Sequence, residues 1–210
     1  MQIIFKKFSP FVTEYQIGNA INRTKWGFFS MGEYLKWYKS IQLIRDKEYP
    51  HLKLIGSSVI DFEFHYTIRT LFNFFTLKYD AFSSLLYVDR RGSPYATQMG
   101  IFDFNNKINM LYALVKFSFK TSNDIYITET NWPLKDTAPY APTSEAECVD
   151  EKEYAKFLKE YYDIALKSGK IKRVYWHQLI ARGYGLVDDS DDKMRRMEGF
   201  DVYKKLLQNL

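Results

Sequence analysis

The sequence predicts an α/β fold built on a parallel sheet. Short apolar runs typical of strands alternate with segments of helical periodicity along the whole chain. Five such strand–helix units are present, and 46% of the 210 residues are hydrophobic, which excludes a disordered chain and suffices for one sizeable core. Two architectures fit this pattern equally well: a five-stranded doubly wound sheet, or part of an eight-fold barrel.

Each predicted element has its own local signal. The predicted strands are residues 14–18, 53–60, 81–88, 124–128 and 172–180. Ser30 with Glu33, and Asp150 with Glu153, have the spacing of capping boxes and predict two helix starts. Apolar residues at helical spacing predict further helices within 108–119 and 200–207. The Phe-rich stretch 71–75 is predicted as a helix, with a buried strand as the alternative.

Composition excludes several classes of function. The 30 Lys and Arg residues outnumber the 25 Asp and Glu residues, but they are spread along the chain, whereas nucleic-acid binding needs clustering, so we expect no nucleic-acid partner. The single cysteine, Cys148, forms no internal disulfide, and no Cys/His ligand set exists, so we expect no metal and no cofactor. Neither a signal peptide nor an apolar run of about 18 residues is present, which leads us to expect a cytoplasmic protein without a membrane partner.

A carboxylate stands at the end of the fourth predicted strand. Glu129 lies in IYITETNWP, and barrel enzymes keep catalytic groups at strand ends of this kind. On the pattern alone, a solvated or hydrogen-bonded structural residue is the stronger interpretation of Glu129. ITETNWP, however, resembles the seventh-strand motif of clan A glycoside hydrolases, the retaining group on the (β/α)8 barrel. The resemblance implies that Glu129 is the nucleophile that attacks the anomeric carbon.

Three further segments resemble the same family. VYWHQLIARGYGLVDD is similar to the eighth strand and its loop, YQIGNAINRTKWG to the fourth strand, and SSLLYVDRRGSP to the sixth. Their order and spacing extend the resemblance over residues 1–210, as a single partial domain holding strands four to eight. The implied fold is an incomplete (β/α)8 (TIM) barrel, of the kind found in bacterial polysaccharide-cluster glycosidases. Carbohydrate is the implied ligand, and Trp176 the implied floor under the sugar ring.

The chain departs from the family pattern at residue 20. The fourth strand of the family ends in Asn-Glu, where Asn holds the sugar 2-hydroxyl and Glu is the acid/base. Here the pair is Asn19-Ala20, and a methyl group cannot donate a proton. Glu63 and His65, and less directly Asp61, are the nearest candidates to replace the acid, although each also fits a structural role.

The remaining candidate residues flank the same strand ends. Arg23 follows the first predicted strand and has the charge to bind an anionic or hydroxyl-rich substrate. Tyr87 ends the third, and Trp132 follows Glu129 as a candidate for stacking on a sugar. Sequence leaves three functions open: a retaining glycosidase, a carbohydrate-binding pseudoenzyme, and a truncated remnant. Without strands one to three, an incomplete barrel exposes its edges, so we also expect self-association or a complementing chain.

Overall fold

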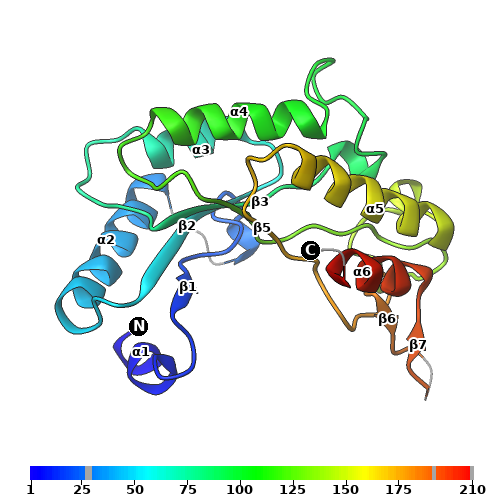
Figure 1. Ribbon diagram of the computed structural model, residues 1–210, viewed down its shortest axis with the longest axis horizontal. Helices are drawn as coiled ribbons and strands as arrows, with labels where there is room; N and C mark the ends of the chain where they lie inside the picture. The colour runs from blue at the N-terminus through cyan, green and yellow to red at the C-terminus, as the bar shows by residue number, and fades with distance from the viewer. Residues whose placement is uncertain (27–29, 191–192, 209–210) are drawn as a thin grey trace. The chain divides into compact units, whose positions relative to one another are not determined.

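The computed structural model describes residues 1–26, 30–190 and 193–208, and Figure 1 labels its elements along the chain. The α-helices are α1 (Gln2–Phe8), α2 (Met31–Glu48), α3 (Phe64–Leu71), α4 (Phe104–Phe117), α5 (Glu151–Lys167) and α6 (Glu198–Gln208). The strands are β1 (Glu14–Gln16), β2 (Lys53–Ile60), β3 (Ala81–Leu85), β4 (Ile125–Ile127), β5 (Arg173–Val174), β6 (Val187–Asp188) and β7 (Arg195–Arg196). Within the described residues, 3₁₀ turns cover Thr24–Trp26, Asp89–Arg91 and Glu145–Glu147.

The main sheet contains five parallel strands in the order β1-β2-β3-β4-β5, and a helix follows each strand along the chain. β1 pairs with β2, β2 with β3, and β3 with β4, all in parallel. The register between β2 and β3 shifts between Ser57 and Val59. A short antiparallel pair, β6 with β7, lies outside this sheet. The predicted fold class is therefore confirmed: the chain is an α/β protein with the strand–helix pattern of an incomplete (β/α)8 barrel.

The chain divides into two compact units. Unit 1 comprises residues 1–86 and 109–128, and unit 2 comprises residues 87–108 and 129–210. Unit 1 therefore contains β1 to β4, while unit 2 contains α5, α6 and the three short strands β5 to β7. That residues 1–210 act as one partial domain stays a prediction.

The core of unit 1 forms where α2 packs on the sheet through buried tyrosines. The Tyr38 and Tyr79 rings meet edge to face with centroids 4.6 Å apart. A Cβ atom at Gly56 would lie 2.7 Å from the Tyr79 ring, so only glycine fits in β2 at this point. Arg45 of α2 donates to the Asp80 carboxylate at 2.5 Å, and the same carboxylate accepts from the Leu54 N–H. These contacts fix α2 against the start of β3.

The core of unit 2 is aromatic and surrounds α5. The Phe104 and Tyr161 rings stack with centroids 3.8 Å apart, and Trp132 packs edge to face on Tyr161. At Gly199 in α6, an added Cβ would lie 2.4 Å from the Tyr154 ring, so α6 approaches α5 as closely as its glycine allows. Aromatic packing of this kind supplies much of the apolar area that the unit buries.

The capping signals in the sequence locate two helices correctly. The Ser30 side chain accepts from the Glu33 N–H at the start of α2, and the Glu33 carboxylate accepts from the Ser30 N–H in return. Asp150 and Glu153 make the same reciprocal pair at the start of α5. In the part of the chain that the structure describes, no helix combines the length and the apolar character needed to cross a bilayer.

The prediction of a helix over residues 71–75 is wrong. Helix α3 ends at Leu71, and the phenylalanines from Phe72 onward follow it in an irregular segment. The Asn73 side chain explains the end of the helix, because its amide donates to the carbonyls of Arg69 and Thr70. Its Oδ1 atom accepts from the Phe75 N–H, and such local side-chain bonds compete with continuation of a helix.

Four of the five predicted strands are longer than the observed ones, and the difference is largest for the third and the fifth. Only Ala81–Leu85 of residues 81–88 forms β3, and only Arg173–Val174 of residues 172–180 forms β5. Beyond β5, the chain uses its backbone groups elsewhere: the Gln178 and Leu179 carbonyls accept from the N–H groups of residues 186 and 187. Apolar periodicity does not distinguish such local pairing from a longer strand in the sheet.

Candidate functional site

The clearest polar arrangement in unit 2 joins two strand ends. Glu129 lies two residues beyond β4, and Tyr87 lies two residues beyond β3. The buried Tyr87 hydroxyl donates a hydrogen bond to Glu129 Oε1. The other carboxylate oxygen of Glu129 has no hydrogen bond among the described residues. The carboxylate is thus held by one oxygen, and the other remains available to a ligand.

Arg91 completes this arrangement, although the sequence did not single it out. Its guanidinium lies 3.3 Å from the centroid of the Tyr87 ring and donates to the Asn131 carbonyl at 3.3 Å. Burial raises the pKa of Tyr87 well above its ordinary value, and the Glu129 charge adds to this, while Arg91 opposes it. Tyr87 therefore remains a protonated donor to Glu129 throughout the physiological pH range. The only signal in the sequence was an arginine in the loop after a buried strand.

Two tryptophans stack on each other beside this group. The Trp132 and Trp176 rings have centroids 5.9 Å apart at an interplanar angle of 18°. Trp132 is 0% exposed and donates from Nε1 to the Gly92 carbonyl. A ring without accessible surface cannot contact a sugar, so Trp132 instead packs against the ring of Trp176. The expectation that Trp132 itself stacks on a sugar does not fit this geometry.

Trp176 keeps part of its surface accessible and is held from several sides. Its Nε1 atom donates to the Tyr154 hydroxyl at 2.9 Å, and that hydroxyl donates to the Tyr184 carbonyl at 3.1 Å. Tyr154, which the sequence did not suggest, therefore fixes the rotation of the indole. A half-buried tryptophan with a fixed ring plane can present one face to an apolar sugar face.

In unit 1, the predicted polar residues form an ion-paired cluster. Arg23 contacts the Asp61 carboxylate at 2.8 Å and the Glu63 carboxylate at 2.5 Å. Partial burial acts to lower the pKa of Arg23, but the hydrogen bonds and charges of Glu63 and Asp61 raise it overall. Asn22 fixes the same loop by pairing with both backbone groups of Ile60. Arg23 is thus neutralised by its own chain, which weakens the expectation that it binds an anionic substrate.

His65 and Asn19 lie at the surface of unit 1. His65 is exposed in the first turn of α3, where its ring contacts Tyr66 at a centroid distance of 4.3 Å. Asn19 is also exposed, and its Oδ1 atom accepts from Gln16 at 3.4 Å. Both side chains are accessible to a ligand.

Ala20 is fully buried, unlike its neighbour Asn19. Its backbone adopts a positive φ of 45°, and its carbonyl accepts from the Arg23 N–H at 2.8 Å. A longer side chain at residue 20 would need its neighbours to move and would have to keep an unfavourable backbone conformation. Sequence alone gave no indication of this burial.

Comparison with families and curated proteins gives no assignment. No protein-family model matches the chain. No curated protein matches it either.

Solved structures of glycoside hydrolases resemble the chain. A GH2 β-galacturonidase from Eisenbergiella tayi bound to galacturonate matches all of this chain with a TM-score of 0.66 at 16% identity. A family 1 β-glucosidase from Thermotoga maritima matches 99% of it with a TM-score of 0.64 at 15% identity. A GH39 enzyme from Xanthomonas axonopodis pv. citri also matches 99%, with a TM-score of 0.64 at 14% identity.

These similarities establish a glycosidase-like fold. The chain spans 36% of the galacturonidase, 66% of the β-glucosidase and 43% of the GH39 enzyme. Identities this low carry the fold but not the reaction, because one fold supports many functions.

Proposed function

We propose that the chain is a glycoside hydrolase-like protein that acts on O-glycosidic bonds of a poly- or oligosaccharide by a retaining mechanism, with Glu129 as the nucleophile. The single observation that carries the proposal is the hydrogen bond from Tyr87 to Glu129 at adjoining strand ends. Carboxylates at the carboxyl ends of barrel strands are where enzymes of this fold perform catalysis. The glycosidase-like fold and the ITETNWP motif support the same assignment.

The proposed reaction proceeds in two displacements. The free oxygen of Glu129 attacks the anomeric carbon, so a glycosyl–enzyme ester forms as the bond to the leaving oxygen breaks. Water then attacks the same carbon and loses a proton to solvent, which releases the sugar and the Glu129 carboxylate. Trp176 supports the sugar ring, and Asn19 holds its 2-hydroxyl, as the resemblance implies. Tyr87 orients the Glu129 carboxylate in both steps.

Departure of the leaving group is the weak step in this chain. Ala20 supplies no proton, and loss of general acid catalysis costs about 10²–10⁴ in rate. Glu63 is already paired with Arg23, whereas His65 is exposed, so the His65 side chain is the more available of these two candidate proton donors. We therefore propose that leaving groups that need no protonation are strongly preferred.

A second candidate function is carbohydrate binding without turnover. The observation that favours it is Ala20, because a buried methyl group replaces the acid while Trp176 keeps an accessible, oriented ring. The two candidates differ in one property: only the enzyme forms a covalent bond to the sugar.

The test uses 2-fluoro glycosides with a dinitrophenolate leaving group, which departs without acid help. The panel includes β-galacturonide and β-glucoside, because the similar structures are a galacturonidase and a glucosidase. We expect intact-mass analysis to show one sugar added, and peptide mapping to place it on Glu129. Glu129→Gln is expected to remove the adduct, whereas Glu147→Gln, a matched change elsewhere in unit 2, is expected to keep it.

The outcomes separate the two candidates. An adduct on any other residue, or an unchanged adduct in the Glu129→Gln protein, would show that the nucleophile is misassigned. Saturable binding of a sugar without an adduct would support the binding function instead. If the folded protein shows neither sugar binding nor an adduct, both candidate functions are contradicted.

A further inference from the structure

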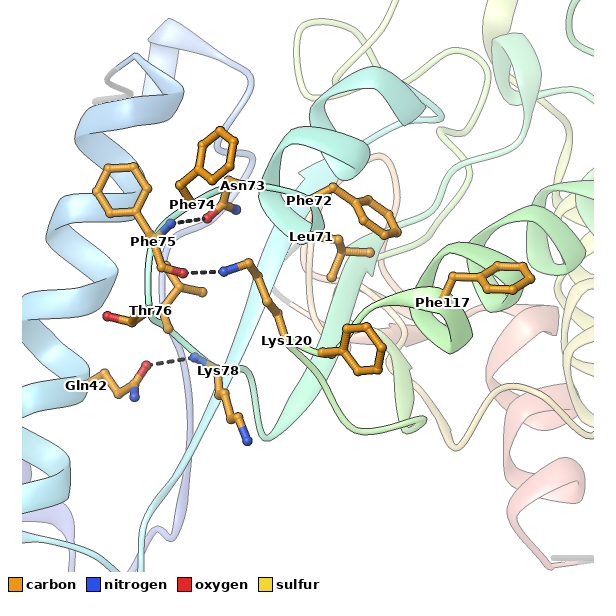
Figure 2. Close-up of a pocket in the computed structure, with 12 residues that line it drawn as sticks. Gln42, Leu71, Phe72, Asn73, Phe74, Phe75, Thr76, Lys78, Phe117 and Lys120 are labelled. Carbon is orange, nitrogen blue, oxygen red and sulfur yellow. Dashed lines mark hydrogen bonds between the residues drawn. The ribbon is translucent and has the colours of Figure 1, made fainter.

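A large cavity in unit 1 lies away from the strand ends that contain the predicted site residues. Its volume is about 700 Å³, and Figure 2 shows the twelve residues that line it, from residues 71–78, residues 117–120 and Gln42. These segments precede β3 and β4, whereas the predicted catalytic groups follow the strands. The Ser118 hydroxyl bonds to the Leu71 carbonyl at 3.2 Å, and the Tyr79 N–H bonds to the Lys120 carbonyl at 2.7 Å, so the segments form one surface.

Four phenylalanines around this cavity project into solvent. We call them the Phe surface: Phe72, Phe74, Phe117 and Phe119. Phe74 and Phe119 are fully exposed, at 106% and 97%, and Phe117 is 76% exposed. In the part of the chain that the structure describes, none of the four makes a ring-to-ring contact. Clustered exposed aromatic rings mark interaction sites, since single exposed apolar residues are common but grouped ones are not.

The two segments that carry the Phe surface have charges of one sign, and the Asp46 carboxylate beside the lining residue Gln42 is paired with Arg45. Residues 69–78 and 116–120 contain four cations, Arg69, Lys78, Lys116 and Lys120, and no acidic residue. Lys78 and Lys120 line the cavity itself, and Lys120 Nζ donates to the Phe75 carbonyl in Figure 2. Arg69 and Lys116 are exposed in the last turns of α3 and α4, the helices that lead into these segments. A partner of this surface must therefore be apolar and negatively charged.

We propose that the Phe surface docks on an anionic lipid bilayer, with its rings at the boundary between headgroups and acyl chains. Exposed aromatic rings combined with lysines are what such a boundary binds, since the rings bury apolar area while each cation is attracted by anionic headgroups. A second copy of the chain is disfavoured, because two such surfaces would bring like charges together.

This inference is independent of the proposed function, and it departs from the expectation of no membrane partner. That expectation came from the lack of a spanning segment in the sequence, and peripheral docking requires none. It also requires none of the residues assigned to the candidate site.

The test is sedimentation of the full chain with vesicles of phosphatidylcholine, alone or mixed with phosphatidylglycerol. We expect binding to the mixed vesicles that weakens as salt increases, and little binding to the neutral ones. Phe74→Ser with Phe119→Ser is expected to weaken binding by at least about tenfold. Both rings are fully exposed, so the variant is expected to fold, as circular dichroism and thermal unfolding would verify. Phe11→Ser, at another exposed phenylalanine, is the matched control and is expected to bind normally.

A second variant tests the charges. Lys78→Glu with Lys116→Glu is expected to weaken binding to the mixed vesicles by at least about 25-fold, at about fivefold for each lysine. Lys152→Glu with Lys204→Glu, at exposed lysines elsewhere, makes the same change in net charge as a control. No binding to mixed vesicles, or binding that survives both surface variants, would overturn the proposal. A dimer or an oligonucleotide complex that the Phe variant abolishes would assign the surface to those partners instead.

Discussion

A single hydrogen bond, from the Tyr87 hydroxyl to the Glu129 carboxylate, joins two residues that the sequence suggested separately. The sequence identified both residues separately, because each follows an apolar strand. Their contact depends on the register of β3 and β4, in which Ser84 pairs with Ile127. Tyr87 lies three residues beyond Ser84 and Glu129 two residues beyond Ile127, so the two side chains emerge from neighbouring strand ends and meet. Arg91 was not foreseen, because a cation stacked on a tyrosine leaves no pattern in the sequence.

Replacing Tyr87 with Phe is expected to slow formation of the Glu129 adduct by about 10–100-fold, since a hydrogen bond to a charged group contributes about 1.5–3 kcal/mol. The physical reason is that the carboxylate loses the donor that orients it. The measurement is the rate of labelling by the activated 2-fluoro glycoside, followed by mass.

Tyr34→Phe provides the control for Tyr87→Phe. Its hydroxyl is also buried and donates to a carbonyl, that of Ile17, but Tyr34 lies in the core of unit 1. We expect it to leave the labelling rate within about twofold, because a change far from the chemistry acts mainly on stability. Equal slowing in both proteins would show that Tyr87 acts through folding rather than on Glu129.

The tryptophans show where prediction from residue type stops. Trp176 and Trp132 each have the chemistry to stack on a sugar, and sequence treated them alike. Burial separates them, because Trp132 is enclosed by Phe157, Tyr161 and Trp176, whereas Trp176 stays partly accessible. Burial is a property of the assembled unit, so no local pattern reports it. The same reasoning applies to Ala20, whose neighbour Asn19 is exposed.

Among the elements, helix starts were predictable and several ends were not. The starts of α2 and α5 carry side-chain caps that a sequence shows directly. Helix α3 ends where the Asn73 side chain donates to the carbonyls of Arg69 and Thr70. The apolar pattern of the adjacent phenylalanines suggested instead that the helix continues. After β5, Gln178 and Leu179 bond through their carbonyls to the N–H groups of residues 186 and 187 instead of extending the strand. These partners are eight residues further along the chain, so no adjacent residue signals the pairing.

The cap of α2 leads to a prediction about stability. Ser30→Ala is expected to lower the free energy of unfolding by about 1 kcal/mol, because the Glu33 N–H loses its acceptor. Urea denaturation followed by circular dichroism measures this change. Ser40→Ala, at an exposed position within the same helix, is the control and is expected to be neutral or slightly stabilising, since alanine favours helix. A loss as large for Ser40 as for Ser30 would contradict the capping role.

The same cap gives the stability a pH dependence. Hydrogen bonds from the backbone and hydroxyl of Ser30 lower the pKa of Glu33 below its ordinary value. A carboxylate with a lowered pKa in the folded state stabilises that state above its unfolded pKa, and the contribution disappears as pH falls through the folded pKa. The difference between the parent and Ser30→Ala proteins is therefore expected to shrink in acid.

For the whole molecule, the fold class was predictable and the division into units was not. Strand–helix alternation predicted five parallel strands, and the resemblance chose the incomplete barrel over the doubly wound sheet. The chain crosses the boundary of the units three times: after β3 at residues 86 and 87, within α4 at residues 108 and 109, and after β4 at residues 128 and 129. No glycine- or proline-rich linker marks any of these points, because the boundary reflects how densely segments pack rather than what joins them.

Cys148 gives a probe of how firmly unit 2 is closed, since it is the single cysteine of the chain. The thiol is 5% exposed, and burial, together with the charge of Glu145, raises the pKa of Cys148. Both effects slow its reaction with a disulfide reagent, because only an accessible thiolate attacks. We expect the folded protein to react at least about 100-fold more slowly than the urea-unfolded protein, since reaction requires local or global opening.

Tryptophan fluorescence provides the comparison, because Trp132 and Trp176 report unit 2 while Trp26 and Trp37 report unit 1. If unit 2 opens cooperatively, the Cys148 thiol becomes reactive at the urea concentration at which the tryptophan fluorescence departs from its folded value. The parent and Trp132→Phe proteins are each compared with their own folded value. Rapid labelling without urea would contradict the packing of residues 144–149 against the unit. Labelling that rises well before the fluorescence changes would place Cys148 in a segment that opens on its own, with the aromatic core of unit 2 still closed.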